Sequence, residues 1–345
     1  MYLQSIATAF PPHSFTQREC LQVLSDSGGM APLRQRSRDL LGKILTGDSG
    51  IATRQFCSPD LSKLFHAGAG ELHQHFETHA PRLASEALLK ACERAATKPS
   101  AIDALLVCTC TGYLCPGLSS YISERLGLRP NAFLQDLLGL GCGAGLPLLE
   151  TARGVLSANP EATVATIAVE ISSAAFYLND DPGVLISLCL FGDGAAAALW
   201  RQNPVGDQFR FHGFRTLHQP QHREKIRFVN ADGRLKNQLD REVPELAALA
   251  VLELFQNKSA APDRLVAHTG GRDVILAIED RLPGHPLDET RAVLRDHGNI
   301  SSPSVLAALE RSIATHPEAR QIWLTAFGAG FSAHAGELTR DCPLS

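Results

Sequence analysis

The residues best suited to chemistry lie around Cys142, within residues 137–159. Glycines flank this cysteine on both sides, and from Leu146 onward apolar residues recur at helical spacing. This pattern predicts a tight turn that leads into the start of a buried helix. Unpaired N–H groups and the positive end of the helix dipole favour a thiolate at such a place. The stretch therefore suits an activated sulfur nucleophile or, alternatively, a small cysteine buried at a glycine-rich packing site.

Two further polar residues lie beside glycines later in the chain. His268 closes the apolar run RLVAH before a Gly-Gly pair, and Asn299 follows Gly298 just before a predicted helix. Each alone has a structural explanation, because a histidine at a strand end often only fills a hydrogen-bonding role and Gly-Asn is a common turn. Together with Cys142 they form a candidate nucleophile with a base and an oxyanion partner.

The elements that must position these residues alternate between strands and helices in both halves of the chain. Apolar runs predict strands, and residues at helical spacing predict helices. The main strands are expected at 104–110, 164–171, 264–268 and 321–327, and the main helices at 80–97, 119–126, 246–255, 272–282 and 303–316. Hydrophobicity falls around residues 203–241, which places a boundary between 1–203 and 204–345. This alternation predicts a layered α/β fold.

Composition excludes several classes of protein. The 345 residues are 44% hydrophobic and 20% charged, with a formal net charge of −4, which is ordinary for a globular protein and argues against nucleic-acid binding. No run of about 18 apolar residues is present, so no membrane span is expected. The N-terminus lacks the features of a secretory signal. The spacing of the nine cysteines predicts no metal site, but reduced thiols in a cytoplasmic protein.

Sequence motifs across most of the chain then point to one family. They are APRLASEA (80–87), TCTGYLCPG (109–117), LGLRP (126–130), GLGCGAG (139–145), VEISSAAF (169–176), LFGDGAAAAL (190–199), VPEL (243–246), VAHTGG (266–271), DHGNISSPSVL (296–306) and AFGAGF (326–331). In this order and spacing they resemble the thiolase superfamily and, within it, the type III polyketide synthases, the chalcone-synthase-like enzymes.

This resemblance implies a fold, an assembly and a reaction. The fold would be a five-layered αβαβα thiolase fold of two pseudo-symmetric halves, and the assembly a homodimer. The reaction would be acyl transfer from an acyl-coenzyme A (acyl-CoA) starter to Cys142, followed by condensation with malonyl-CoA, with no metal and no bound cofactor. The His268 ring and the Asn299 amide would stabilise the enolate formed by decarboxylation. A protonated His268 would hold the Cys142 thiolate as an ion pair.

The resemblance also assigns residues to substrate binding. Phe191 matches a gatekeeper phenylalanine between the CoA tunnel and the reaction cavity, and Cys115 matches a residue that reaches into the partner's cavity. Arg54, in an expected loop at 50–54, lies near the segment that contacts the CoA phosphates. The other matching positions are Cys110, Ser172, Ala175, Asn237, Ser301, Phe327 and Gly328.

Two departures from the family pattern affect the expected product. The loop sequence Ala-Phe-Gly-Ala-Gly at 326–330 replaces the usual Gly-Phe-Gly-Pro-Gly and is closer to the stand-alone ketoacyl synthases. Asn237 stands where a second aromatic gatekeeper is usual, and Cys110, Ser172 and Ala175 are small. Small residues at these positions predict a wide apolar pocket that prefers a medium or long acyl starter.

Three functions are therefore compatible with the sequence. The leading hypothesis is an iterative polyketide synthase that condenses malonyl-CoA onto an acyl-CoA starter. An alternative is a ketoacyl-synthase-like enzyme that makes one β-ketoacyl product in a single condensation. A remote alternative is a non-catalytic paralogue that binds acyl-CoA, against which the complete set of Cys142, His268 and Asn299 argues.

Overall fold

The computed structural model describes residues 1–340, so that Cys342 lies outside the described residues. The strands are β1 (Tyr2–Ala9), β2 (His13–Thr16), β3 (Thr53–Phe56), β4 (Ala104–Cys108), β5 (Phe133–Leu137), β6 (Val164–Glu170), β7 (Gly194–Arg201), β8 (Phe209–His218), β9 (Ile226–Ala231), β10 (Arg234–Leu239), β11 (Arg264–Ala267), β12 (Gln321–Gly328) and β13 (Ser332–Arg340). The helices are α1 (Gln17–Asp26), α2 (Gln35–Thr46), α3 (Leu61–His66), α4 (Ala69–Arg94), α5 (Leu118–Leu126), α6 (Gly145–Ala158), α7 (Pro182–Leu190), α8 (Val243–Gln256), α9 (Arg272–Arg281), α10 (Asp288–His297) and α11 (Ser304–Thr315).

The central sheet has nine strands in the order β11-β12-β13-β8-β1-β7-β6-β4-β5. It consists of two parts, because β1 and β8 are paired only at Tyr2 and Arg210. One part holds strands from the first half of the chain, and the other holds strands from the second half. Successive residues of β6 face opposite sides of the sheet, and helices cover both sides, which explains its unbroken apolar run.

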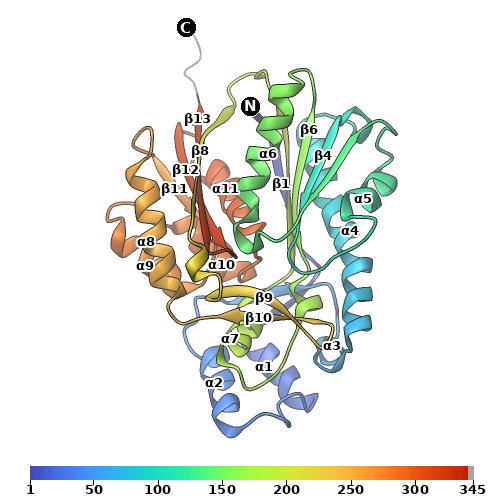
Figure 1. Ribbon diagram of the computed structural model, residues 1–345, viewed down its shortest axis with the longest axis vertical. Coiled ribbons are helices and arrows are strands. Elements are labelled where there is room, and N and C mark those ends of the chain that lie inside the picture. The colour runs from blue at the N-terminus through green and yellow to red at the C-terminus, as the bar shows by residue number, and fades with distance from the viewer. Residues whose placement is uncertain (341–345) are drawn as a thin grey trace.

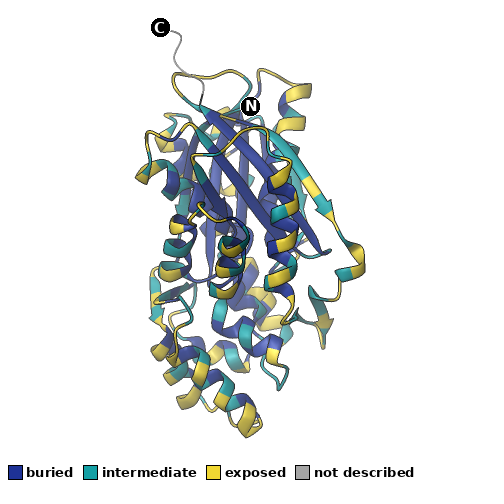
Figure 2. Cartoon of the chain, turned by 90° about the vertical axis from the view of Figure 1, so that its left-hand side faces the viewer, coloured by how far each residue is buried: buried dark blue, intermediate teal, exposed yellow. Residues whose placement is uncertain are grey.

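Helices complete a five-layered αβαβα arrangement, as the sequence predicted (Figure 1). The middle layer is formed by α6 and α11, whose apolar residues share one core with strands from both parts of the sheet. The outer layers are α4 and α5 on the first part and α8 and α9 on the second. Figure 2 shows the central strands buried and the outer helices exposed along one face only.

Several local expectations were incomplete. α4 begins at Ala69 rather than at residue 80, because a polar first half and Pro81 concealed its helical pattern. Thr53 and Arg54, at the end of the loop expected at 50–54, instead begin β3, which pairs with β2. The polar stretch around 203–241 contains β8 and the β9–β10 hairpin. In residues 1–340 no helix is long and apolar enough to cross a membrane.

The division into residues 1–203 and 204–345 stays a prediction. The boundary falls in the connection between β7 and β8, where the chain leaves one part of the sheet for the other. The core around α6 and α11 nevertheless draws residues from both sides of that boundary. The reactive residues of the two halves therefore meet around a shared central layer.

Candidate active site

Cys142 lies in a short 3-10 turn, Gly141–Ala144, that runs directly into α6. The loop at 326–330 packs against this turn, so that a side chain at Gly141 would meet the Ala329 backbone nitrogen at 3.0 Å. Gly141 also has a φ of 58°, which favours glycine. Cys142 is 8% exposed. The predicted position at the start of a buried helix is confirmed.

Ser301 connects the three residues predicted to carry the chemistry. Its backbone N–H donates to Asn299 Oδ1 at 2.8 Å, and its hydroxyl donates to Cys142 Sγ at 3.2 Å. The ring of His268, just after β11, hydrogen-bonds the Ser301 backbone. Ser301 has a φ of 58°, an uncommon conformation for a non-glycine residue and one often found at functional sites. The structure thus brings Cys142, His268 and Asn299 together around one serine.

A buried carboxyl group, which the sequence analysis missed, lies behind Ser301. Glu170 at the end of β6 accepts hydrogen bonds at Oε1 from the side chains of Cys110, Ser301 and Ser302, at 3.3, 3.3 and 2.5 Å. Its Oε2 accepts from residues 109–111. Glu170 therefore ties the ends of β4 and β6 to the Ser301 turn. The sequence did contain a signal for this residue, because Glu170 is a charged residue at the end of the otherwise apolar strand β6.

Burial shifts the ionisation of both reactive groups at the centre. Burial raises the pKa of the Cys142 thiol to about 12, although the Ser301 hydroxyl bond opposes this. Burial also lowers the pKa of His268 to about 3. Both shifts favour the neutral forms of the two groups, because desolvation opposes the helix dipole at this depth. The expected ion pair of thiolate and protonated imidazole stays a prediction.

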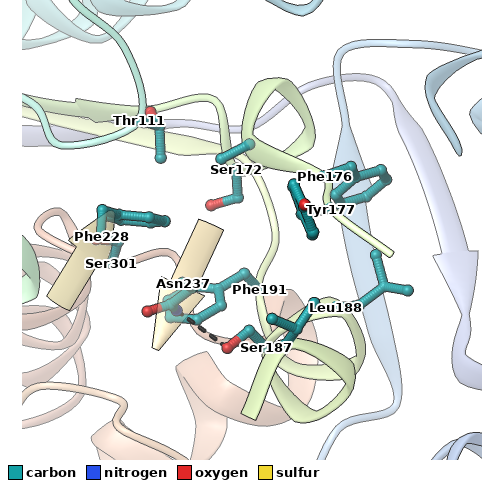
Figure 3. Close-up of a pocket in the computed structure, with 12 residues that line it drawn as sticks. Thr111, Ser172, Phe176, Tyr177, Ser187, Leu188, Phe191, Phe228, Asn237 and Ser301 are labelled. Carbon is teal, nitrogen blue, oxygen red and sulfur yellow. Dashed lines mark hydrogen bonds between the residues drawn. The ribbon is translucent and has the colours of Figure 1, made fainter. Parts of the chain in front are cut away.

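A partly open cavity of about 30 Å³ adjoins the centre (Figure 3). Five predicted substrate-binding residues line it: Ser172, Ala175, Phe191, Asn237 and Ser301. The other lining residues are Thr111, Phe176, Tyr177, Val184, Ser187, Leu188 and Phe228. The backbone on both sides of Phe191, the predicted gatekeeper, is hydrogen-bonded to Asn299. The Asn299 N–H donates to the Leu190 carbonyl, and the Gly192 N–H donates to the Asn299 carbonyl.

The expected wide pocket is not observed. Phe228 on β9 lies directly opposite Asn237 on β10 and lines the cavity that Asn237 was expected to leave open. β10 has no aromatic residue at position 237, and Phe228 on β9 places an aromatic ring at the cavity instead. The Asp232-Gly233 turn could have revealed this, because an Asp-Gly hairpin turn fixes which residues face each other across the two strands.

Phe327 and Gly328 also lie at the centre. The Phe327 ring meets the His268 ring edge to face, with 5.1 Å between ring centroids. A side chain at Gly328 would come within 3.0 Å of the Cys142 backbone nitrogen. Cys110 lies beside the centre, with its sulfur 3.3 Å from the Ser301 hydroxyl. Cys115 is exposed and does not line this cavity, and its role in a partner subunit stays a prediction.

Arg54 does not occupy the expected position. Its side chain is buried, and its guanidinium donates to the carbonyls of Leu188 and Phe191 at 2.7 and 2.8 Å and to Gln17 Oε1 at 2.9 Å. These contacts satisfy carbonyls at the C-terminal end of α7, where a cation is favoured. Assignment of Arg54 to the CoA phosphates was therefore wrong, because its charge points into the protein and secures the Phe191 backbone.

Within residues 1–340, no group of three or more His, Cys, Asp or Glu side chains is placed to hold a metal ion. The eight cysteines in that range are free thiols. The site consists of a cysteine, a histidine and an asparagine with the hydroxyl and carboxyl groups around them.

A five-layered α/β fold with a cysteine at the start of its central helix, facing a histidine and an asparagine, defines a thiolase-fold condensing enzyme. Residues 8–221 match the FAE1/type III polyketide synthase-like protein family. The chain belongs to this family and is a type III polyketide synthase, an acyltransferase that forms polyketides by decarboxylative condensation.

Characterised relatives support this membership over nearly the whole chain. A 1,3,6,8-tetrahydroxynaphthalene synthase of Streptomyces griseus is 29% identical, over 95% of this chain and 89% of the relative. A phloroglucinol synthase of Pseudomonas fluorescens is 26% identical, over 96% and 97%. The structure of a 1,3,6,8-tetrahydroxynaphthalene synthase of Streptomyces coelicolor, a bacterial type III polyketide synthase, matches with a TM-score of 0.88 at 25% identity, covering 99% of this chain and 100% of that one.

Proposed function

We propose that Cys142 carries the growing acyl chain, while His268 and Asn299 promote decarboxylation of malonyl-CoA. The observation that supports this most directly is the Ser301 turn, which gathers thiol, imidazole and amide at the edge of one cavity. In the first step, Cys142 Sγ attacks the starter thioester and its proton passes to His268. The thiol of CoA then leaves with that proton. His268 thus acts as the general base for Cys142 and returns the proton to the leaving group.

In the second step, malonyl-CoA loses carbon dioxide and forms an enolate. The charge on its thioester oxygen is stabilised by hydrogen bonds from the His268 ring and the Asn299 amide. The enolate carbon attacks the acyl group on Cys142, a carbon–carbon bond forms, and the carbon–sulfur bond breaks to release the Cys142 thiolate. The product is a β-ketoacyl-CoA, which returns to Cys142 for further extension. Membership of the type III polyketide synthase family favours this repeated cycle over the single-condensation alternative.

The nucleotide end of CoA needs a basic surface near the cavity, and Arg54 is not available. A larger surface cavity of about 620 Å³ lies between residues 47–52, the start of α9 and α10, with Arg272, Arg291 and Arg295 on its walls. Gly271, which precedes Arg272, lies against Leu190, the residue before Phe191. We infer that the CoA phosphates bind in this surface cavity.

The protein is proposed to work as a homodimer. β5 is an edge strand that pairs only with β4, and it carries exposed Phe133 and Leu134. Exposed Tyr113 and Leu138 extend this apolar surface, and Cys115 lies near it. An unpaired apolar edge strand is a template for association with another chain. Light scattering should give a dimer mass at micromolar concentration, and a stable, active monomer would contradict the proposal. A cytoplasmic location also stays a prediction, supported by the free thiols.

The test of the function is incubation with malonyl-CoA and a panel of acyl-CoA starters, followed by mass spectrometry of small products. We expect pyrones, resorcinols or related aromatic products built from several malonyl units. Accumulation of one β-ketoacyl-CoA would favour the single-condensation alternative. Binding of acyl-CoA without carbon dioxide release or any new product would favour the non-catalytic alternative.

A further inference from the structure

The Ser301 hydroxyl lies between the nucleophile and a buried carboxyl group. It is 3.2 Å from Cys142 Sγ and 3.3 Å from Glu170 Oε1, and Ser301 is one of the residues that line the reaction cavity (Figure 3). A hydroxyl group has one proton to donate, so that it serves either the sulfur or the carboxyl oxygen at any moment. The structure therefore places a donor with two alternative acceptors beside the reacting atom.

Glu170 retains other donors when the Ser301 proton points to the sulfur. Its Oε1 also accepts from the Ser302 hydroxyl at 2.5 Å and from the Cys110 thiol at 3.3 Å, and its Oε2 accepts from residues 109–111. A buried carboxyl group without hydrogen bonds would be costly, but these donors remain in place. Rotation of the Ser301 hydroxyl toward Cys142 therefore leaves the Glu170 carboxyl group hydrogen-bonded.

The thiolate form of Cys142 is disfavoured at this position and gains most from a donor. Burial raises the pKa of the thiol, the Ser301 hydroxyl bond opposes this rise, and the charge of Glu170 adds to it. A neutral thiol is a weak acceptor, whereas a thiolate forms a stronger, charge-assisted hydrogen bond. Because this interaction strengthens as charge develops on the sulfur, it stabilises the transition state more than the resting protein.

We propose that Ser301 is a catalytic residue whose hydroxyl stabilises the Cys142 thiolate each time that it forms. This inference rests on the proposed function. In acyl transfer the thiol proton passes to His268, and the electron pair left on the sulfur forms the bond to the acyl carbon while CoA leaves with that proton. In condensation the carbon–sulfur bond breaks and its electron pair stays on Cys142 Sγ. Decarboxylation of malonyl-CoA places its charge on a different atom, the thioester oxygen.

Separate measurement of the half-reactions tests this role. Acyl transfer is followed by intact mass as the rate at which acetyl-CoA forms an adduct on Cys142, and decarboxylation as carbon dioxide released from malonyl-CoA alone. Ser301→Ala should slow acyl transfer about ten- to a hundredfold, as expected for one hydrogen bond to a charged group, while decarboxylation keeps most of its rate. Discharge of the adduct by free CoA should slow by a similar factor, because Cys142 is then the leaving group.

Two further variants separate this role from a structural one. Ser301→Gly also lacks the hydroxyl but adopts the φ of 58° without strain, so that it should reproduce the low ratio of acyl transfer to decarboxylation even if Ser301→Ala folds poorly. Ser302→Ala is the matched control, because Ser302 donates to the same Glu170 oxygen rather than to Cys142, and this ratio should stay at the wild-type value. Equal loss of both half-reactions in the two Ser301 variants, or undiminished acyl transfer, would overturn the proposal. Failure of wild-type Cys142 to take up any acyl group would instead contradict the proposed function.

Discussion

The catalytic centre and the β9–β10 wall contact the same cavity but are built in different ways. Cys142, His268 and Asn299 are 8%, 1% and 3% exposed and sit on turns fixed by the central sheet and its middle helices. Phe228 and Asn237 lie on a two-stranded hairpin outside that sheet, half-buried and held by side-chain contacts. The comparison suggests that the core of the fold fixes the chemistry, while a peripheral hairpin determines which acyl groups reach it.

Asn299 should show the largest effect at the centre. Asn299→Ala removes one donor to the enolate, which costs about 3–4 kcal/mol or two to three decades in the rate of malonyl decarboxylation. Transfer of the starter to Cys142 should persist, as measured separately by intact mass. Asn299→Asp is the companion variant, because it keeps an acceptor for the Ser301 N–H while removing the amide donor. Equal loss of acyl transfer and decarboxylation in both variants would mean that Asn299 is only structural.

The next largest effect is expected in the pH dependence of Cys142 alkylation, which reports the protonation state of its thiol. Because burial raises the pKa of this thiol to about 12, its thiolate fraction should rise about tenfold for each pH unit from 7 to 9. The rate of alkylation of Cys142 by iodoacetamide, followed by peptide mass spectrometry in the absence of substrate, should rise in parallel. A rate that is already level near pH 7 would show a resting thiolate and contradict the raised pKa.

Substitution of Arg54 distinguishes a structural role, support of the cavity wall at Phe191, from a role in CoA binding. Arg54→Met leaves the carbonyls of Leu188 and Phe191 without their donor, and the free energy of unfolding should fall by about 3–5 kcal/mol. The KM for malonyl-CoA in the remaining folded protein should change little. Arg153→Met, at an exposed arginine paired with Glu150, is the matched control and should change stability by no more than about 0.5 kcal/mol. A large rise in KM with unchanged stability would restore the CoA assignment.

Arg272 should give the smallest effect, because it is exposed and already paired with Asp273. Arg272→Ala should raise the KM for malonyl-CoA a few-fold, in line with about 1 kcal/mol for one exposed charge contact. The KM for the N-acetylcysteamine thioester of malonate, which lacks the nucleotide phosphates, should stay unchanged. Arg153→Ala serves as the control for a lost surface charge. An equal rise for both thioesters would exclude phosphate binding at Arg272.

The sequence predicted the centre well because its signals are local. Glycines around Cys142, a strand ending at His268 and a turn at Asn299 each report the backbone at that position, and the alternation of strands and helices predicted the layers. The resemblance to a known family then connected the three residues. Local signals also located most of the helices and strands of the central layers, although α4 was cut short at its polar beginning.

The cavity wall and the position of Arg54 were mispredicted, and the burial of the centre was not foreseen, for physical reasons. Asn237 was judged alone, whereas the ring of Phe228 enters from the facing strand and depends on hairpin register. Arg54 was expected at the CoA phosphates because it lies near the segment that contacts them in the family, and only the fold reveals the carbonyls of Leu188 and Phe191 that it binds. The raised pKa of Cys142 follows from its depth of burial, which the sequence around it does not reveal.

The most direct test of the central claim is to locate the acyl group on the protein. Wild-type protein and Cys142→Ala would each be incubated with acetyl-CoA and analysed by intact mass and peptide mapping. The account predicts one acyl adduct, on Cys142 alone, and none in the variant, although the Cys110 sulfur lies only 3.3 Å from the same Ser301 hydroxyl. An adduct on Cys110 in the wild-type protein, or any adduct that persists in Cys142→Ala, would contradict it.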